Sequence, residues 1–145
     1  MEHPAWTVVD WRRSVADLYR RVRELEPAEG HDLWVGERRR LLSTHPASPV
    51  PADQRAGFRG GQVAAYDASF RFVVPVREAA PERREVVTGT DGVVVFERIG
   101  RVDLPDLGTL DLWWLTSYGG GLFLPLRDLT SGDTSYGGGR YLLDT

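Results

Sequence analysis

Two predicted strands and the turn that joins them occupy residues 109–127, TLDLWWLTSYGGGLFLPLR. Side chains of alternating character run through residues 109–117, which is the period-two pattern of a strand. We expect Trp113 and Trp114 to lie on opposite faces of a sheet, because successive side chains of a strand point to opposite sides. A glycine triplet then precedes the apolar run 122–127, and glycine supplies the positive φ that a tight turn needs. The stretch therefore predicts an antiparallel hairpin.

Further strands are predicted on both sides of this hairpin. Phenylalanine and valine alternate with other residues in one segment, and Asp91-Gly92 is a turn signal between two short apolar runs. Ser131-Gly132 and Asp133 mark the last turn. The predicted strands are residues 70–77, 85–88, 93–99, 109–117, 122–127 and 134–143.

The first third of the chain has the three-and-four spacing of apolar residues that indicates helices. We expect Asp10 to cap a first helix that ends at Pro27 and Gly30, and a second helix to start at Asp32. Closely spaced prolines after His45 stop any helix, since proline disfavours the helical conformation of the residue before it. His45 is predicted to end the second helix.

The predicted architecture is α+β, with N-terminal helices followed by an antiparallel β-meander that forms a sandwich or a partly open barrel. Residues 1–145 are expected to form a single domain. Its parts are a helical segment, a loop and an antiparallel sheet, at residues 1–45, 46–65 and 66–145.

Composition excludes several classes of protein. The 145 residues carry a formal net charge of −3, which argues against a nucleic-acid partner. There is no run of about 18 apolar residues, so we expect no membrane partner, and the N-terminus lacks a secretory pattern. The chain has no cysteine, and all 18 basic residues are arginine, which excludes thiolate and lysine chemistry. We expect a soluble cytoplasmic protein.

The remaining polar residues give few signals of catalysis or metal binding. The three histidines lack the spacing of a metal site, so neither a metal nor another cofactor is expected. The run Arg38-Arg39-Arg40 is predicted to be a solvated helix face, with contact to an acidic partner as the alternative. Asp103, Asp106 and Asp111 are predicted to belong to a solvated turn rather than to an acidic pair.

The hexapeptide TSYGGG occurs twice, at residues 116–121 and 134–139. We expect the first copy to form the hairpin turn described above. The second copy is predicted to lie inside the last strand, opposite Pro125, where glycines mark a bulge or a close approach by a ligand. The candidate ligand-binding residues there are Arg127, Asp128, Thr130, Tyr136, Gly137, Gly138, Gly139 and Arg140.

Three functional hypotheses follow from this irregular glycine-rich strand. The first is a binding module for a small anionic ligand, held by arginine and by backbone N–H groups. The second is an enzyme of unknown reaction in which Asp128 acts as general base and Arg140 holds the substrate anion. The third is a structural or interaction protein in which the glycines are purely architectural. The sequence leaves open whether the protein is an enzyme.

Residues 122–142, LFLPLRDLTSGDTSYGGGRYL, resemble the signature of a prokaryotic family called domain of unknown function 1684. Members have an apolar strand followed by Pro, Asp, Thr-x-Gly and Tyr-Gly-Gly-Gly-Arg-Tyr-Leu. His45–Val50 and Gly60–Phe72 are similar to the family's upstream segments. The resemblance implies a β-rich fold with N-terminal helices and no defined activity.

Family members usually continue into a cysteine-containing tail with an Asn-Pro-x-Cys segment, whereas this sequence stops at Thr145. We expect that the tail was lost or the chain cut. An absent tail would expose a strand edge, and this favours a homodimer through that edge.

Overall fold

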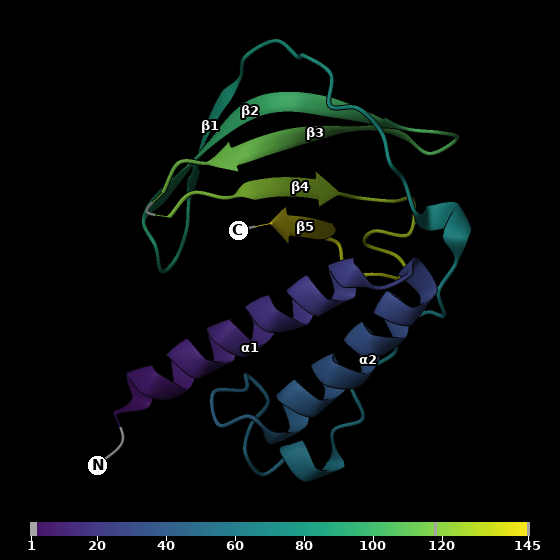
Figure 1. Ribbon diagram of the computed structural model, residues 1–145. Coiled ribbons are helices and arrows are strands. Elements are labelled where there is room, and N and C mark those ends of the chain that lie inside the picture. Colours follow the sequence, from purple (N-terminus) through teal and green to yellow (C-terminus); the bar gives the residue numbers. More distant parts are fainter. Residues whose placement is uncertain (1–2, 118, 145) are drawn as a thin grey trace. The chain divides into compact units, whose positions relative to one another are not determined.

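The computed structural model describes residues 3–117 and 119–144 (Figure 1). It contains two N-terminal helices followed by an antiparallel sheet, which confirms the α+β class. The chain divides into two compact units, which meet between Arg71 and Phe72 in the sequence. Each unit is described by itself, and the single domain expected above stays a prediction.

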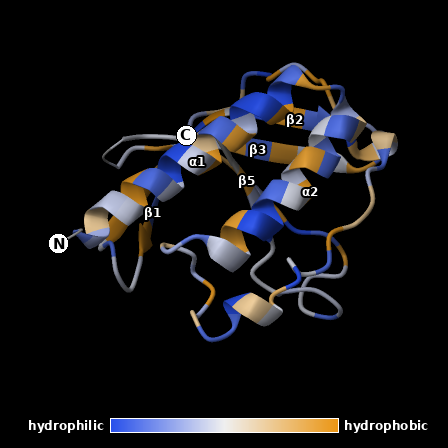
Figure 2. Ribbon diagram, turned by 60° about the horizontal axis from the view of Figure 1, so that its bottom comes forward, coloured by the Kyte–Doolittle hydropathy of each residue, from blue (hydrophilic) through white to orange (hydrophobic). Residues whose placement is uncertain are grey.

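The first helix, α1, spans Pro4–Glu24 and begins earlier than predicted. The ring Nδ1 of His3 accepts a hydrogen bond from the Ala5 N–H at 3.1 Å, and Pro4 occupies the first helical turn, where its missing N–H costs nothing. Asp10, expected to be the cap, lies inside the helix. Figure 2 shows hydrophilic and hydrophobic residues alternating along the helices, as amphipathic packing requires.

The second helix, α2, spans Pro27–Thr44, so Pro27 and Gly30 begin it instead of ending α1. Pro27 is its first residue, a position that tolerates proline. Gly30 is buried, and a Cβ there would come within 2.9 Å of the Val22 carbonyl oxygen. Gly30 therefore lets α1 and α2 approach closely, which a helix-breaking interpretation of glycine misses.

His45 caps the end of α2, as predicted, and also ties that end to α1. Only 8% of the residue is exposed. Its Nδ1 accepts the Ala47 N–H at 3.0 Å, and its Nε2 lies 3.1 Å from Asp10 Oδ2. Because Nδ1 accepts, the proton of the neutral ring belongs on Nε2, which donates to Asp10. The edge of Trp11 packs on the ring at 5.2 Å between centroids.

The segment after α2 is a loop with one short 3₁₀ turn, η1, at Arg55–Gly57. The Arg55 guanidinium holds it together by donating to the carbonyl oxygens of Val50, Ser48 and Pro46 at 2.8, 3.1 and 3.3 Å. These contacts satisfy carbonyl groups that no strand or helix pairs.

The strand predicted over residues 70–77 is wrong. Its start belongs to a second 3₁₀ turn, η2, at Ala68–Phe70, and only Arg77 pairs, in an isolated bridge with Arg101. The Asp67 carboxylate accepts the Ser69 N–H at 2.9 Å and so closes a local turn in place of a ladder. Pro75 also has no N–H to donate to a neighbouring strand.

The sheet contains five strands in the order β1-β2-β3-β4-β5, each antiparallel to its neighbour (Figure 1). Among the described residues these strands form one open meander that is not closed into a barrel. The strands are β1 Arg83–Val87, β2 Val93–Leu104, β3 Gly108–Leu115, β4 Leu122–Leu126 and β5 Arg140–Asp144.

Trp113 and Trp114 have different environments, in agreement with their placement on opposite faces of β3. Trp113 is 5% exposed, with the guanidinium carbons of Arg84 and Arg98 lying 4.8 and 5.9 Å from its ring centroid. The same Arg98 donates to Asp111 at 3.0 Å, so the ring is covered by paired charges. Trp114 packs instead on the β3–β4 turn.

That turn contains the first glycine triplet, as predicted, although Tyr118 lies outside the described residues. The three glycines have φ of 94°, 65° and 152°. A Cβ on Gly120 would lie 2.8 Å from Cη2 of Trp114 and closer still to Cζ2. The turn therefore needs glycine at residue 120 for its backbone and for its contact.

We predict that Gly120→Ala destabilises the protein more than Gly119→Ala. Both positions have positive φ, which costs an alanine about 1 kcal/mol, but a Cβ at Gly119 meets nothing within 4 Å. Displacing the Trp114 ring adds about 1–3 kcal/mol at Gly120. Urea unfolding followed by circular dichroism measures the difference, and equal losses for the two variants would contradict the packing role of Trp114.

Candidate functional site

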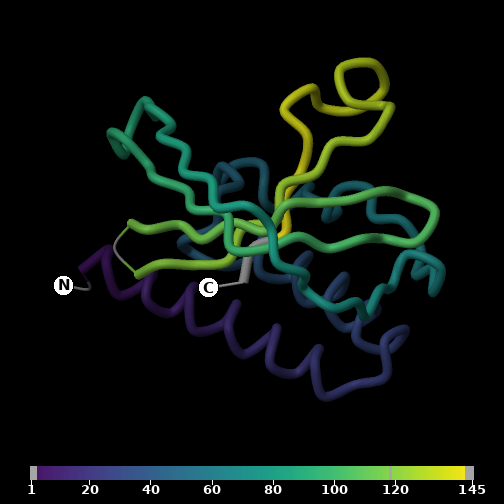
Figure 3. Tube along the Cα trace, turned by 90° about the horizontal axis from the view of Figure 1, so that it is seen from above, coloured from purple at the N-terminus to yellow at the C-terminus, as the bar shows by residue number. Residues whose placement is uncertain are grey.

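The predicted site residues all lie on the segment between β4 and β5 or at its two ends. Figure 3 shows this segment as a looped excursion away from the strands. The last strand was predicted to start at Thr134, but β5 begins at Arg140, and Gly137 and Gly138 form an exposed turn. The position opposite Pro125 is Tyr141 and not a glycine. The glycine-rich strand predicted from the sequence is therefore a loop.

Side-chain hydrogen bonds explain why the chain makes a loop here. Asp128 Oδ1 accepts from the Thr130 N–H at 2.8 Å and from the Thr130 hydroxyl at 2.5 Å. The Thr130 carbonyl then accepts three backbone N–H groups, from Asp133, Thr134 and Ser135, at 3.0–3.1 Å. Such local bonds compete with strand pairing, and here they use the residues that would have extended β5.

The glycines of the second triplet serve the close packing of this loop. Gly139 has φ of 79°, and a Cβ on it would lie 2.5 Å from the Leu126 carbonyl oxygen and 2.6 Å from Cγ of Arg127. A Cβ on Gly138 would meet the Tyr136 ring, 2.9 Å from Cζ. These contacts favour the architectural interpretation of the triplet.

The polar groups of the loop are paired with one another and open to solvent. Arg140 Nη1 lies 3.5 Å from Asp128 Oδ2, and both side chains are more than half exposed, so the pair contributes little to stability. The Thr130 hydroxyl, followed by the Thr130 N–H, lowers the pKa of the Asp128 carboxyl below its ordinary value. A carboxylate with a lowered pKa is a weak general base near neutral pH.

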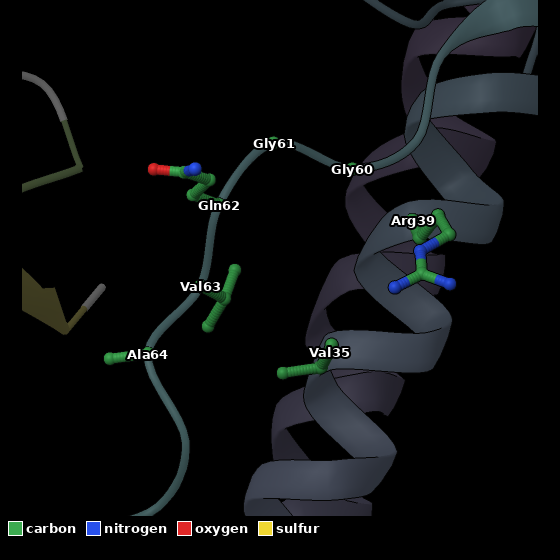
Figure 4. Close-up of a pocket in the computed structure, with 7 residues that line it drawn as sticks. All are labelled: Val35, Arg39, Gly60, Gly61, Gln62, Val63 and Ala64. Atoms are coloured by element: carbon green, nitrogen blue, oxygen red, sulfur yellow. The ribbon is translucent and has the colours of Figure 1, made fainter.

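A concave site lies in the first unit, between α2 and the segment 60–64 (Figure 4). Its volume is about 570 Å³, within the 300–1,000 Å³ that is usual for small-molecule sites. Val35 and Val63 face the gap from its two sides in Figure 4, and Gln62 points away from α2. The lining residues are Val35, Arg39, Gly60, Gly61, Gln62, Val63 and Ala64.

One hydrogen bond ties the segment to the helix, and its donor also contacts an aromatic ring of α2. Arg38 Nη1 donates to the Gly60 carbonyl oxygen at 2.7 Å, and the Arg38 guanidinium carbon lies 5.6 Å from the ring centroid of Trp34. A Cβ on Gly60 would be only 3.1 Å from Nε of Arg39. Gly60 and Gly61 both have positive φ, 92° and 71°, and so turn the chain along α2. The cavity lies between this segment and α2.

The residues that line the cavity include apolar side chains and groups with hydrogen-bond donors that have no described acceptor. Within the described part of the chain, the Arg39 guanidinium has no ion pair or hydrogen bond, whereas its neighbour Arg40 is paired with Glu37 at 2.9 Å. The backbone N–H groups of residues 61–64 likewise donate to no described group. Such donors beside a guanidinium favour an anion.

Sequence reasoning missed this cavity. The Arg38-Arg39-Arg40 run was predicted to be a solvated face, and Arg39 and Arg40 are indeed exposed. Arg38 is half-buried and anchors a carbonyl, and the exposed Arg39 also lines the cavity. A signal was present in Gly60-Gly61, because two adjacent glycines favour a left-handed turn. The two sides of the cavity are far apart in the sequence, since Arg38 and Gly60 are separated by 22 residues. No local sequence pattern indicates that they come together.

Other polar side chains of the molecule are used structurally. The Ser48 hydroxyl donates to the Leu42 carbonyl at 2.6 Å and accepts the Val50 N–H at 3.1 Å. Of the three aspartates predicted to belong to a solvated turn, only Asp106 lies in the turn, while Asp103 belongs to β2 and Asp111 to β3. Asp111 pairs with Arg101 and Arg98, and Asp103 with Arg77, so these two carboxylates are already used in ion pairs. In the described ranges no three His, Asp or Glu side chains gather where they could hold a metal ion.

A family model matches the whole of the second unit and the last part of the first. The model described as "Protein of unknown function (DUF1684)" matches residues 56–145, which is more than half of the chain. The chain belongs to this family. Segment 60–64 and the β4–β5 loop lie inside the DUF1684 match, while Val35 and Arg39 precede it. A comparison with curated proteins gives no match.

None of the described helices has the length and hydropathy to cross a membrane.

We predict that Thr130→Val raises the pKa of Asp128 toward the ordinary aspartate value of about 3.9, because it removes the larger of the two hydrogen bonds that lower that pKa. The stabilisation from a lowered pKa is present above the ordinary value and is lost as the pH falls through the lowered one. A ¹³C NMR titration of the Asp128 carboxyl measures the shift. Thr134→Val is the control, and an unchanged Asp128 pKa in Thr130→Val would contradict the assignment.

We also predict that Gly139→Ala costs about 2–4 kcal/mol, because it combines positive φ with a clash against a backbone oxygen. Gly138→Ala should stay within about 0.5 kcal/mol, because the exposed Tyr136 side chain can move away. Chemical denaturation of both variants tests this ranking, and a larger loss for Gly138→Ala would reverse our interpretation of the loop.

Proposed function

We propose that this DUF1684 protein is a binding module for a small anionic ligand, and that the ligand binds in the cavity between α2 and residues 60–64. The observation that carries the proposal is the Arg39 guanidinium, which lines a cavity of about 570 Å³ without a carboxylate partner among the described residues. The anionic class of ligand agrees with the hypothesis drawn from the sequence. The position differs from it.

The chemistry of the cavity suits a carboxylate or phosphate that carries an apolar body. A guanidinium donates two parallel hydrogen bonds to such an anion, and the N–H groups of residues 61–64 can donate to its remaining oxygens. Val35 and Val63 offer methyl groups to the apolar part. A charge-assisted hydrogen bond contributes about 1.5–3 kcal/mol, so loss of Arg39 should weaken binding roughly tenfold to a hundredfold.

The β4–β5 loop is the second candidate position, since Arg127 and Arg140 flank its glycines. Arg140 faces Asp128 at 3.5 Å, so an anion there would compete with a carboxylate already in place. The enzyme hypothesis depends on Asp128 as base, and the lowered pKa of that carboxyl counts against it. The positive φ of Gly139 and its close contact with the Leu126 carbonyl oxygen support an architectural role for that glycine. The homodimer expected from the sequence stays a separate proposal.

A thermal-shift titration with sodium phosphate, citrate and hexanoate, at constant ionic strength, tests the proposal. Phosphate and citrate also stabilise proteins non-specifically, so the comparison is between variants. We expect a saturable rise in Tm for the wild type, Arg140→Ala and the charge-matched control Arg13→Ala. Arg39→Ala should lose the rise, and Arg39→Lys should keep only part of it because lysine lacks the planar fork.

The variants separate the alternatives. A rise lost in Arg140→Ala and kept in Arg39→Ala would place the site on the β4–β5 loop and overturn the cavity. Equal rises in all variants, or no saturable rise with any probe, would contradict anion binding through either arginine.

A further inference from the structure

The outer edge of β5 has features of an interface between two copies of this chain. In the described sheet β5 pairs only with β4, so one edge of its backbone has no strand partner. Tyr141 and Leu142 are each 62% exposed. An edge strand with exposed apolar side chains and unpaired N–H and C=O groups is a template for pairing with another strand.

The opposite edge of the sheet differs. The first three of the five residues of β1 are the charged Arg83, Arg84 and Glu85. Charged side chains on an edge strand oppose pairing with another strand. The apolar centre of β5 is not interrupted in this way, because its charges stand only at the two ends of the sequence Arg140-Tyr141-Leu142-Leu143-Asp144.

This five-residue sequence is complementary to itself in one arrangement. In an antiparallel pair centred on Leu142, position 140 of one copy lies opposite position 144 of the other, and position 141 lies opposite position 143. An arginine then faces an aspartate at each end, and opposite charges across strands contribute about 0.2–1 kcal/mol per pair. A parallel pair would set arginine against arginine, and a shift by two residues would lose both charge pairs.

The register of β4 with β5 places an apolar residue of β4 opposite each of these end positions. Leu126 lies across from Arg140 and Leu122 across from Asp144. The contact of Arg140 with Asp128 is long and exposed. We propose that two copies of this chain associate through β5, antiparallel and centred on Leu142, into a two-fold symmetric dimer. A two-fold interface closes on itself and stops at two copies.

A cysteine cross-link tests the register directly, because the chain has no cysteine of its own. Opposed residues of an antiparallel pair have Cα atoms about 4.5–5.5 Å apart, which is within the range that a disulfide can bridge. We expect Leu142→Cys to form a disulfide-linked dimer under mild oxidation. Tyr141→Cys, which faces position 143 rather than itself, should cross-link far less, and so should Val86→Cys on β1.

Sedimentation velocity tests the charge pairs over a concentration range of about 10–500 µM, suited to a weak association. Arg140→Glu and Asp144→Arg should each shift the protein toward the monomer, and the double variant should recover the dimer because the reversed charges pair again. Circular dichroism of each variant checks that it is folded.

A wild-type protein that stays monomeric would overturn the proposal. Equal cross-linking of Leu142→Cys and Tyr141→Cys, or oligomers that keep growing with concentration, would do the same. The ligand screen with Arg39 variants is independent of these results, because Arg39 and β5 belong to different units.

Discussion

The absence of a Cβ at a few glycines is the constraint on which the structure depends. Gly60 lets a loop lie against the Arg39 side chain, Gly120 lets the β3–β4 turn pass over Trp114, and Gly139 lets the chain enter β5 beside the Leu126 carbonyl. Each glycine has positive φ as well as a close neighbour. A larger residue would have to displace the Arg39 side chain at Gly60, the Trp114 ring at Gly120 and the backbone at Gly139. These glycines therefore set how closely the neighbouring segments can pack.

The two arginine-bearing candidate regions differ in whether their polar groups are already used. In the β4–β5 loop, Asp128 and Thr130 bond to each other and to the backbone, and Arg140 faces Asp128. In the cavity beside α2, the Arg39 guanidinium and a run of backbone N–H groups have no partner among the described residues. Arg39 and residues 61–64 are exposed, so their donors can bind a ligand without first breaking a bond to another protein group. This difference is why we place the proposed anion beside α2.

The sequence predicted the elements set by periodicity and missed those set by local side-chain bonds. The helices, the hairpins and the turn at the first glycine triplet follow from spacing and turn chemistry, and they are present. The two segments wrongly predicted to be strands, residues 70–77 and 134–139, each follow a turn in which an aspartate, Asp67 or Asp128, accepts the N–H two residues further along the chain. Aspartate can close a turn in this way within any strand-like pattern, so alternation alone does not exclude it. The cavity escaped notice because Arg39 and Gly60 meet only in the folded chain. Membership of the DUF1684 family, seen in the second glycine triplet, agrees with the family match and implies no activity.

The most direct test of the proposed anion site is a ¹H–¹⁵N NMR titration of the protein with sodium phosphate and then with hexanoate. The account predicts saturable shifts of the backbone N–H signals of residues 61–64 and of the Arg39 Nε–H signal, with the signals of residues 137–140 unchanged. Shifts confined to residues 137–140, or uniform small shifts over the whole chain, would contradict it.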